Sequence, residues 1–378
     1  MTRGTASVPA FSAADHAWMA RALAVAARGR LTATPNPAVG CVIVSGERVL
    51  GEGWHSRAGE PHAEAMALAA CGGRAPGATV YVTLEPCSHH GRTPPCADAL
   101  VAAGVARVVA AVGDPDPRVS GHGFERLRAA GIRVETGLLE AEARRHHRGF
   151  LSRLSRGRPW MRLKAGASLD GRIALANGES RWITGEDARR DVHRLRAESC
   201  AVLTGIGTVL ADDPELTVRH VPCDRQPRRV VIDHRLELPE SAKLLAGEPP
   251  LVLTVSDDAS RASRLARLGA EVVRVPGEGT KADLAAVARL LAERGYGEVL
   301  VETGAKLGGS LARAGLVDEF VFYAAPRLLG DAAQGLLALG AFERLADAPR
   351  LVLSQVAAVG NDLRITAHPE TPPCSPAS

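Results

Sequence analysis

The sequence predicts a chain of two α/β domains. Its 378 residues exceed the usual length of one domain by about a factor of two. β-rich runs alternate with runs of helical periodicity, which is typical of layered α/β folds. This alternation starts again after Ser155-Arg156-Gly157-Arg158-Pro159. We therefore expect one domain at residues 13–157, a second at 158–367, and a disordered proline-rich tail at 368–378.

The first expected domain opens with a helix at 15–29, where apolar residues recur at helical spacing and a glycine follows. Two β-rich runs separated by Ser45-Gly46-Glu47 then predict a hairpin. A helix at 62–71 is indicated by Pro61 before it and Gly72-Gly73 after it. The remaining elements alternate and predict a largely parallel sheet, with strands at 79–84, 106–112 and 132–136 and helices at 95–103, 124–130 and 139–153.

The second expected domain shows the same alternation. Its short apolar runs are rich in Val, Leu and Ile, and amphipathic helical runs separate several of them. We expect strands at 160–165, 201–204, 229–233, 251–255, 271–275, 299–302 and 319–324, with helices at 187–197, 281–293 and 308–313.

The amino-acid composition indicates which kinds of binding partner the protein can have. Lys and Arg total 46 against 42 Asp and Glu, a net charge of +4, and only 3% of residues are aromatic, so nucleic-acid binding is not expected. No run of eighteen uncharged apolar residues predicts a membrane span. Seven cysteines, an odd number, argue against a disulfide framework. We expect a cytoplasmic protein that acts on a small molecule.

Two short motifs carry metal chemistry. One is His62-Ala63-Glu64, and the other is Pro86-Cys87 with a second cysteine at Cys96. One imidazole and two thiolates leave the fourth tetrahedral position of a zinc ion open, which is typical of a catalytic site. A carboxylate is then needed to move the proton of an activated water, and Glu64 is available. His-x-Glu followed by Pro-Cys-x-x-Cys is the signature of zinc nucleobase deaminases.

The spacing differs from that signature in one respect. Eight residues separate Cys87 from Cys96 instead of two, so the intervening loop must bulge and could contact substrate. His62 and Glu64 also diverge by about 200° on an ideal helix, so they can share a site only at a helix start, where Pro61 places them. The alternative is that Cys87 and Cys96 are buried structural thiols and that His62 caps a helix.

Nucleotide motifs are weak in the second half. Gly205-Ile206-Gly207 and Gly295-Tyr296-Gly297 lack the third glycine of the dinucleotide fingerprint, and no P-loop is present. The segment from Gly304 to Ser310 follows an expected strand and opens a helix, so its amides could face a pyrophosphate. A plain tight turn explains this segment equally well.

Taken together, the motifs resemble the bifunctional riboflavin-biosynthesis deaminase/reductase family over residues 17–365. The segments that carry the resemblance are Thr34-Pro35-Asn36-Pro37-Ala38-Val39-Gly40, Gly59-Glu60-Pro61-His62-Ala63-Glu64, Thr83-Leu84-Glu85-Pro86-Cys87, Lys164-Ala165-Gly166-Ala167-Ser168-Leu169-Asp170-Gly171, Trp182-Ile183-Thr184 and Leu210-Ala211-Asp212-Asp213-Pro214.

The resemblance implies a three-layer N-terminal domain like cytidine deaminase and a C-terminal α/β domain like dihydrofolate reductase. The first would hydrolyse the ring amine of a diaminohydroxyphosphoribosylaminopyrimidine, with one zinc per chain on His62, Cys87 and Cys96 and with Glu64 moving the proton. The second would use NADPH to reduce the ribosyl group to ribityl, giving 5-amino-6-(5-phosphoribitylamino)uracil. A homo-oligomer is implied by analogy alone.

The resemblance also assigns contacts. Substrate contacts in the first domain would be Asn36, His55, His89 and Arg92, the last through a forked bond to phosphate. Substrate contacts in the second would be Lys164, Ser180, Arg196, Leu216, Arg219 and Glu302. NADPH would contact Gly166, Trp182, Thr208, Asp212, His234, Gly304, Ala305, Lys306, Leu307, Gly308, Gly309 and Ser310. His234 stands where relatives commonly carry a smaller polar residue such as Ser.

Two other functions fit parts of the pattern. A tRNA or nucleobase deaminase with a non-catalytic C-terminal binding domain would share the zinc motif, but the cysteine spacing, low aromatic content and weak charge disfavour it. A structural zinc module joined to a ligand-sensing domain would need a fourth protein ligand, for which His89 and His90 are the nearby choices.

Overall fold

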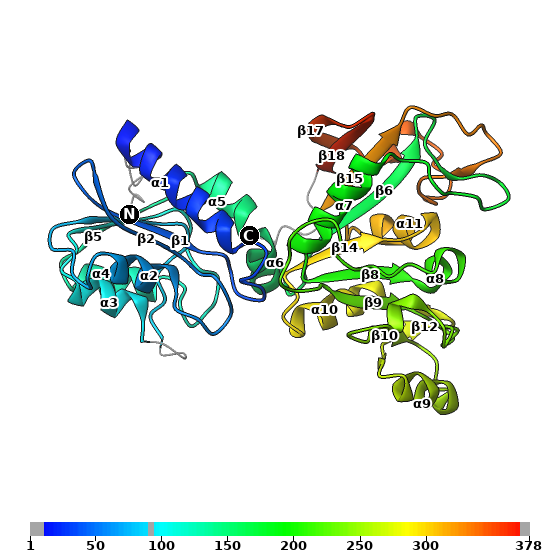
Figure 1. The fold of residues 1–378 in the computed structure, drawn as a ribbon, viewed down its shortest axis with the longest axis horizontal. Helices are drawn as coiled ribbons and strands as arrows, with labels where there is room; N and C mark the ends of the chain where they lie inside the picture. The colour runs from blue at the N-terminus through cyan, green and yellow to red at the C-terminus, as the bar shows by residue number, and fades with distance from the viewer. Residues whose placement is uncertain (1–10, 90–93, 371–378) are drawn as a thin grey trace, which may run out of the picture. The chain divides into compact units, whose positions relative to one another are not determined.

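The computed structural model describes residues 11–89 and 94–370. The chain divides into two compact units, Met1–Arg156 and Gly157–Ser378. Each unit is an α/β fold built on its own sheet, as the sequence predicts (Figure 1). No helix within the described residues is long and apolar enough to cross a membrane.

The N-terminal unit is built on a five-stranded sheet in the order β2-β1-β3-β4-β5. Its strands are β1 (Gly40–Ser45), β2 (Arg48–Trp54), β3 (Thr79–Val82), β4 (Arg107–Ala110) and β5 (Arg133–Thr136). The expected largely parallel sheet is only half correct, because β3, β4 and β5 run parallel whereas β1 pairs antiparallel with both β2 and β3. The hairpin turn reverses the chain directly and leaves no crossover that could make β1 and β2 parallel.

Helices cover both faces of this sheet and make three layers. One face packs against α2 (Ala63–Ala70), α3 (Cys96–Ala102) and α4 (His122–Ala129). The other packs against α1 (Ala13–Ala26), which continues as a 3₁₀ turn at Ala27–Gly29, and α5 (Glu140–His146), as Figure 1 shows. The single helix expected at 139–153 is wrong: α5 ends at His146, and α6 (Arg148–Arg156) begins after His147. His147 is buried there, and its Nε2 lies 3.0 Å from Thr83 Oγ1.

Two glycines on β2 bring α2 close to the sheet. A Cβ on Gly51 would lie 2.2 Å from the carbonyl oxygen of Ala67, and a Cβ on Gly53 would lie 2.3 Å from that of Ala63. Any larger residue at these positions would push the helix away from the strand. This close approach sets the position of the helix start, where His62 and Glu64 lie.

The C-terminal unit is built on a nine-stranded sheet in the order β11-β10-β9-β8-β14-β6-β15-β18-β17. The strands from β11 to β15 in this order are parallel, and only β18 and β17 are antiparallel. The parallel strands are β6 (Trp160–Ser168), β8 (Ala201–Gly205), β9 (Arg228–Ile232), β10 (Leu251–Thr254), β11 (Glu271–Arg274), β14 (Glu298–Glu302) and β15 (Glu319–Ala325).

Helices again cover both faces. α10 (Leu284–Glu293) and α11 (Ala305–Arg313) pack on one face, while α7 (Glu186–Glu198), α8 (Ile206–Asp212) and α9 (Ala259–Arg267) pack on the other. The sequence analysis did not predict α8 or α9. Short elements complete the unit: β7 (Arg172–Ala174) pairs with β16 (Gln334–Gly335), β12 (Gly277–Glu278) pairs with β13 (Lys281–Ala282), and 3₁₀ turns occupy Lys243–Leu245 and Leu345–Asp347.

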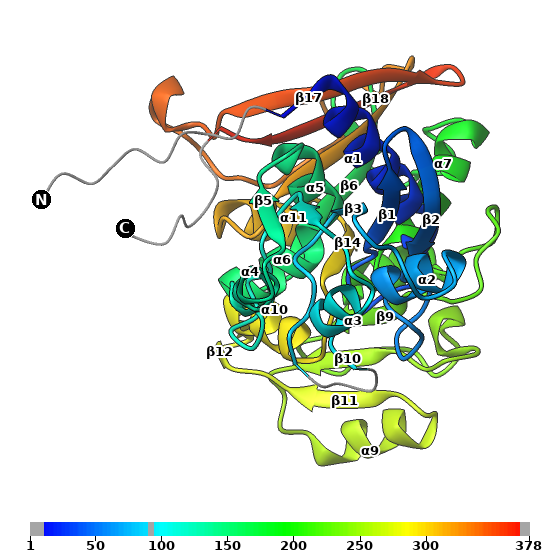
Figure 2. The same cartoon turned by 90° about the vertical axis from the view of Figure 1, so that its left-hand side faces the viewer.

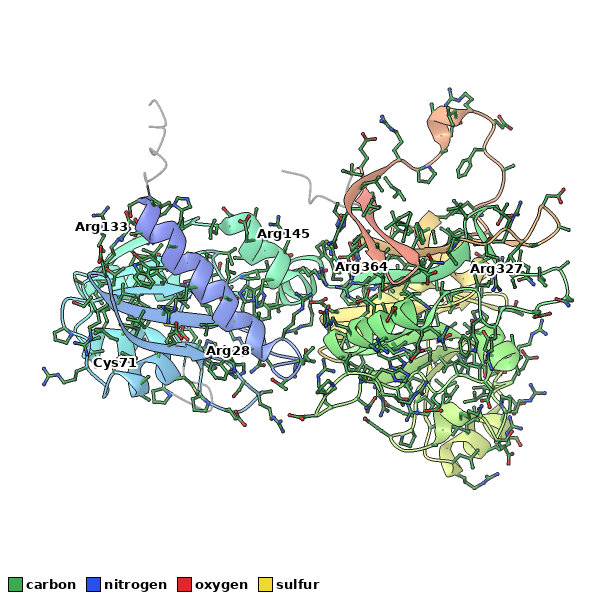
Figure 3. All side chains as sticks on the ribbon, turned by 45° about the horizontal axis from the view of Figure 1, so that its top comes forward. Arg28, Cys71, Arg133, Arg145, Arg327 and Arg364 are labelled. Carbon is green, nitrogen blue, oxygen red and sulfur yellow. The ribbon has the colours of Figure 1, made fainter. Side chains whose placement is uncertain are left out.

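The sequence analysis also missed the hairpin that ends the fold. β17 (Leu351–Val359) and β18 (Asp362–Pro369) lie side by side along one edge of the sheet (Figure 2). The predicted start of the tail at residue 368 is therefore too early, since His368 and Pro369 belong to β18. Residues 371–378 lie outside the described part of the chain. On β18, Arg364 (Figure 3) pairs with Asp191 of α7 at 2.8 Å.

Candidate functional site

The first site forms where α2 and α3 begin. His62 is the N-cap residue of α2, Cys96 is the first residue of α3, and Cys87 lies in the loop that follows β3. His62 Nδ1 is 3.5 Å from Cys87 Sγ and 3.4 Å from Cys96 Sγ. Ligand atoms around a tetrahedral zinc with the usual Zn–N and Zn–S bond lengths are roughly 3.6 Å apart. The spacing and chemistry of these three side chains therefore fit a zinc ion.

Glu64 lies two residues after His62, in the first turn of α2, and is only 3% exposed. Because His62 precedes the first helical residue, the two side chains need not diverge as they would within a helix. Burial, followed by the neighbouring Cys87, raises the pKa of Glu64 to about 7. A hydrogen bond from Cys96 and another from His62 lower the pKa of Cys87 to about 4. The site thus combines a thiolate with a carboxyl group that can exchange a proton near neutral pH.

The structure places His55 and Asn36 next to this cluster. The rings of His55 and His62 lie 5.4 Å apart in a T-shaped arrangement. His55 is 2% exposed, and both of its nitrogens have partners, at 3.2 Å from the carbonyl oxygen of Pro61 and 3.1 Å from Asn36 Nδ2. Since a carbonyl can only accept, Nδ1 carries the proton and Nε2 accepts from Asn36. This pairing orients Asn36.

Of the two other substrate contacts expected at this site, the structure describes His89 but not Arg92. His89 is half-buried, and its Nδ1 has no hydrogen-bond partner among the described residues. Arg92 lies outside the described residues, as does His90. The three atoms of His62, Cys87 and Cys96 lie within 4.8 Å of one another, and no fourth ligand joins them in the described part of the chain.

Sequence reasoning did not single out Glu85, although it lies in a quoted motif. This carboxylate is 4% exposed and accepts backbone N–H groups from Asp114, Gly121, Gly123 and Phe124, at 3.0 to 3.3 Å. It therefore ties the loop after β4 and the first turn of α4 to the segment that leads from β3 to Cys87. Burial raises the pKa of Asp114 in this loop to about 6. The signal in the sequence was the acidic residue immediately before Pro-Cys.

The second site is a cavity of about 540 Å³ in the C-terminal unit. It opens near the carboxyl ends of parallel strands, where ligands of open α/β sheets usually bind. Eleven of the expected reductase residues line it, namely Lys164, Gly166, Ser180, Trp182, Arg196, Thr208, Asp212, Leu216, Arg219, Glu302 and Gly304. His234 and the segment from Ala305 to Ser310 are not part of its wall. Gly304 follows β14 and caps α11, and its N–H is 3.2 Å from Thr208 Oγ1.

A buried charge cluster forms the floor of this cavity. Arg196 binds the Glu302 carboxylate through Nε at 2.5 Å and Nη2 at 3.0 Å, and Lys164 Nζ lies 3.7 Å from the same carboxylate. Although burial opposes ionisation, the charges of Arg196 and Lys164 hold the pKa of Glu302 at about 2. Burial lowers the pKa of Lys164 in spite of Glu302. The cluster carries a net positive charge, which suits a phosphorylated ligand.

Two arginines hold Trp182 in the wall of this cavity. The Trp182 ring stacks on the Arg189 guanidinium at 4.5 Å, and the Trp182 carbonyl accepts from Arg327 at 3.2 Å. Arg189 also donates to the carbonyl of Thr184 at 2.7 Å. Trp182 is therefore held in the cavity wall while the residue stays 61% exposed, and a flat ligand could stack on its ring.

Known proteins resemble both units. Residues 12–112 match the family described as the cytidine and deoxycytidylate deaminase zinc-binding region, and residues 159–365 match the RibD C-terminal domain. The riboflavin biosynthesis protein RibD of Escherichia coli is 49% identical, with 92% of this chain and 98% of that protein covered. RibD of Haemophilus influenzae is 45% identical, at coverages of 95% and 99%.

Two solved structures of similar proteins match this chain over both units. Acinetobacter baumannii RibD superposes with a TM-score of 0.87 at 44% identity, covering 94% of this chain and 99% of that one. A Thermotoga maritima diaminohydroxyphosphoribosylaminopyrimidine deaminase/5-amino-6-(5-phosphoribosylamino)uracil reductase superposes with a TM-score of 0.83 at 32% identity, with coverages of 94% and 98%. The zinc-binding deaminase domain, the reductase domain and the identity over nearly the whole chain lead to one conclusion: the chain belongs to the RibD family of bifunctional riboflavin-biosynthesis deaminase/reductases.

Proposed function

We propose that residues 13–157 deaminate a diaminohydroxyphosphoribosylaminopyrimidine and that residues 158–367 reduce the product with NADPH to 5-amino-6-(5-phosphoribitylamino)uracil. The observation that carries the first step is the trio of His62, Cys87 and Cys96 beside the buried Glu64. The activity for which the Thermotoga maritima relative is named supports the choice of substrate. A coupled assay of ammonia release and NADPH oxidation tests both steps at once.

In the deaminase unit, His62, Cys87 and Cys96 would hold one zinc ion per chain. Zinc at such a site supplies a water whose pKa is lowered towards neutrality. Glu64 takes the proton of the attacking water on its carboxylate and delivers it to the leaving amine, which departs as ammonia. A buried carboxyl group beside the attacking water can make both transfers. Asn36, held by His55, would contact the substrate, and the segment containing His89 and Arg92 would do so from the loop between the cysteines.

In the reductase unit, bound NADPH would supply hydride to the sugar carbon in its ring-opened imine form, in which the ring C–O bond is already broken, and a proton would complete the amine. The residues of the chain place the two reactants, since positioning is the main contribution of a protein to hydride transfer. Lys164, Ser180, Arg196, Leu216, Arg219 and Glu302 would bind the substrate. The cofactor would contact Gly166, Trp182, Thr208, Asp212, His234, Gly304, Ala305, Lys306, Leu307, Gly308, Gly309 and Ser310.

Replacing Cys87 with Ala is expected to reduce bound zinc from about one per chain to below a tenth and to abolish ammonia release, because one of three ligands is lost. NADPH-dependent reduction of the deaminated intermediate should persist, since the two sites lie in separate units. Metal analysis and the two separate assays measure these effects. Cys71→Ala is the control, because the Cys71 thiol instead bonds the carbonyl oxygen of Ala67. Zinc that remained in Cys87→Ala would rule out this ligand assignment.

We also propose that the protein is a homo-oligomer. β17 is the edge strand of the nine-stranded sheet, and its side chains at Val352, Leu353 and Val356 are more than half exposed. Exposed apolar edges are commonly covered by a partner. Sedimentation equilibrium should show more than one chain per particle at micromolar concentration, and Val356→Asp should shift this equilibrium towards single chains. A single chain per particle for the wild type would refute the proposal.

The cytoplasm is the proposed location. Cys41, Cys71, Cys87, Cys96, Cys200 and Cys223, which are the cysteines within the described residues, are all free thiols. Free thiols are typical of reducing compartments. Fractionation of cells that produce the protein would locate it.

A further inference from the structure

We propose that His193 is a neutral hydrogen-bond donor to the phosphorylated ribosyl chain of the reductase substrate, and that it also positions the loop that carries Arg219. This inference rests on the proposed function of the C-terminal unit. His193 lies on α7, three residues before Arg196, so the two side chains share one helix face. Both line the cavity, and His193 is 5% exposed. Neither the motifs of the sequence nor the resemblance pointed to it.

A backbone contact fixes the tautomer of this histidine. The N–H of Arg219 lies 3.1 Å from His193 Nδ1. A backbone N–H can only donate, so Nδ1 must be the unprotonated nitrogen of the ring. The proton of the neutral ring is therefore on Nε2. Within the described residues, the structure gives Nε2 no oxygen or nitrogen acceptor, which leaves the N–H available to a ligand in the cavity.

The surroundings keep the ring neutral. Burial, then the charges of Arg196, His220 and Arg219, lower the pKa of His193 to about 4, and Glu302 only partly opposes them. An imidazolium would also place a proton on Nδ1 against the N–H of Arg219. His193 can therefore donate from Nε2 without adding charge, whereas Lys164 and Arg196 supply the positive charge for the phosphate. Sugar hydroxyl and phosphate oxygens are the acceptors that such a donor fits.

The same contact holds the loop that follows α8. Two side chains of α7 form hydrogen bonds with the backbone of this loop. Arg196 Nη1 donates to the carbonyl of Thr217 at 2.9 Å, and His193 Nδ1 accepts from the N–H of Arg219. The loop includes Leu216, whose φ of 54° is in the left-handed region. A backbone held in that region depends on its surroundings for support. His193 thus fixes the backbone from which Leu216 and Arg219 face the cavity.

Two substitutions separate the two roles. His193→Asn keeps an acceptor near the position of Nδ1 through its Oδ1 but has no counterpart of the Nε2 donor. His193→Phe keeps the ring shape and removes both. We expect His193→Asn to weaken binding of the deaminated substrate, measured calorimetrically without NADPH, by about 3–10-fold, the contribution of one neutral hydrogen bond. His193→Phe also leaves the N–H of Arg219 without a partner, so a loss of about 30–100-fold is expected.

The controls use the same chain. Arg190→Gln changes an exposed position on α7 whose ion pairs within the described residues are with Glu186 and Asp187, and it should leave substrate affinity within about twofold. Ammonia release by the N-terminal unit and the thermal midpoint report whether each variant is folded. The KM of the reductase should rise with the Kd in both variants.

The outcomes are distinct. Wild-type affinity in His193→Phe would overturn the whole inference, and wild-type affinity in His193→Asn alone would overturn the donor role while supporting the positioning role. A graded loss across the two variants supports both roles. A wild-type chain that neither binds the substrate nor oxidises NADPH would instead contradict the proposed function, and the inference with it.

Discussion

Replacing Glu64 with Gln is expected to lower the rate of ammonia release by about 10²–10⁴-fold, the usual contribution of a positioned acid–base group. The amide has nearly the same shape and can still accept a hydrogen bond, but it cannot take a proton from water and return it to the leaving amine. Zinc content should remain at one per chain, because Glu64 is not among the three atoms that cluster at the site. NADPH-dependent reduction of the deaminated intermediate should be unchanged.

This result would separate a catalytic zinc site from a structural one. A structural site would tolerate the substitution, so full deaminase activity in Glu64→Gln would contradict the assigned role. The matched control is Glu47→Gln in the exposed turn between β1 and β2, which should behave as the wild type. Measuring zinc alongside ammonia release is essential, since loss of the metal would also abolish activity for an unrelated reason.

The three zinc ligands expected from the sequence, His62, Cys87 and Cys96, lie together in the structure, and the signals that suggested them are local. His62 and Glu64 are two residues apart, and the signals that start α2 are a proline and a following run of helix formers. Cys87, in the loop after β3, and Cys96, at the start of α3, lie close to His62 in the structure. His55 was expected to touch substrate, yet the structure engages both of its nitrogens with Asn36 and Pro61. The pairing of His55 with Asn36, 19 residues away in sequence, depends on tertiary structure, so local sequence patterns do not predict it.

Other parts of the fold were harder to predict from the sequence. β17 was missed because its apolar residues run together instead of alternating, so the strand lacks the period of two that marks a half-buried strand. A usable signal was present, because Gly360-Asn361 lies between the two strands as a two-residue hairpin loop. The break at His147 had only a weak signal, the nearby Gly149, because one glycine is tolerated within a helical pattern. The buried contact that accompanies the break is with Thr83, 64 residues away in sequence. His193 was missed because its hydrogen bond is with the backbone of Arg219, which is 26 residues away in sequence.

The largest effect expected in the reductase unit follows from replacing Glu302 with Gln. The amide cannot offer two anionic oxygens to Arg196, and it leaves the largely buried Arg196 and the partly buried Lys164 without a counter-charge. Breaking a buried ion pair in this way is strongly destabilising. The depression of the Glu302 pKa from 4.5 to about 2 corresponds to about 3 kcal/mol of stability at neutral pH. We also expect the kcat/KM of the reductase to fall by about 100-fold or more, since positioning of the two cations is lost.

The pH dependence of that loss identifies its cause. The folded-state pKa of Glu302 lies below its ordinary value, so its stabilising effect is complete above about pH 4.5 and disappears as the pH falls through 2. Urea unfolding at pH 7 should therefore show a large difference between the wild type and Glu302→Gln, and at pH 3 a smaller one. Glu293→Gln, at the exposed end of α10, is the control and should unfold like the wild type at both pH values. A difference independent of pH would mean that packing, and not the buried charge, gives Glu302 its importance.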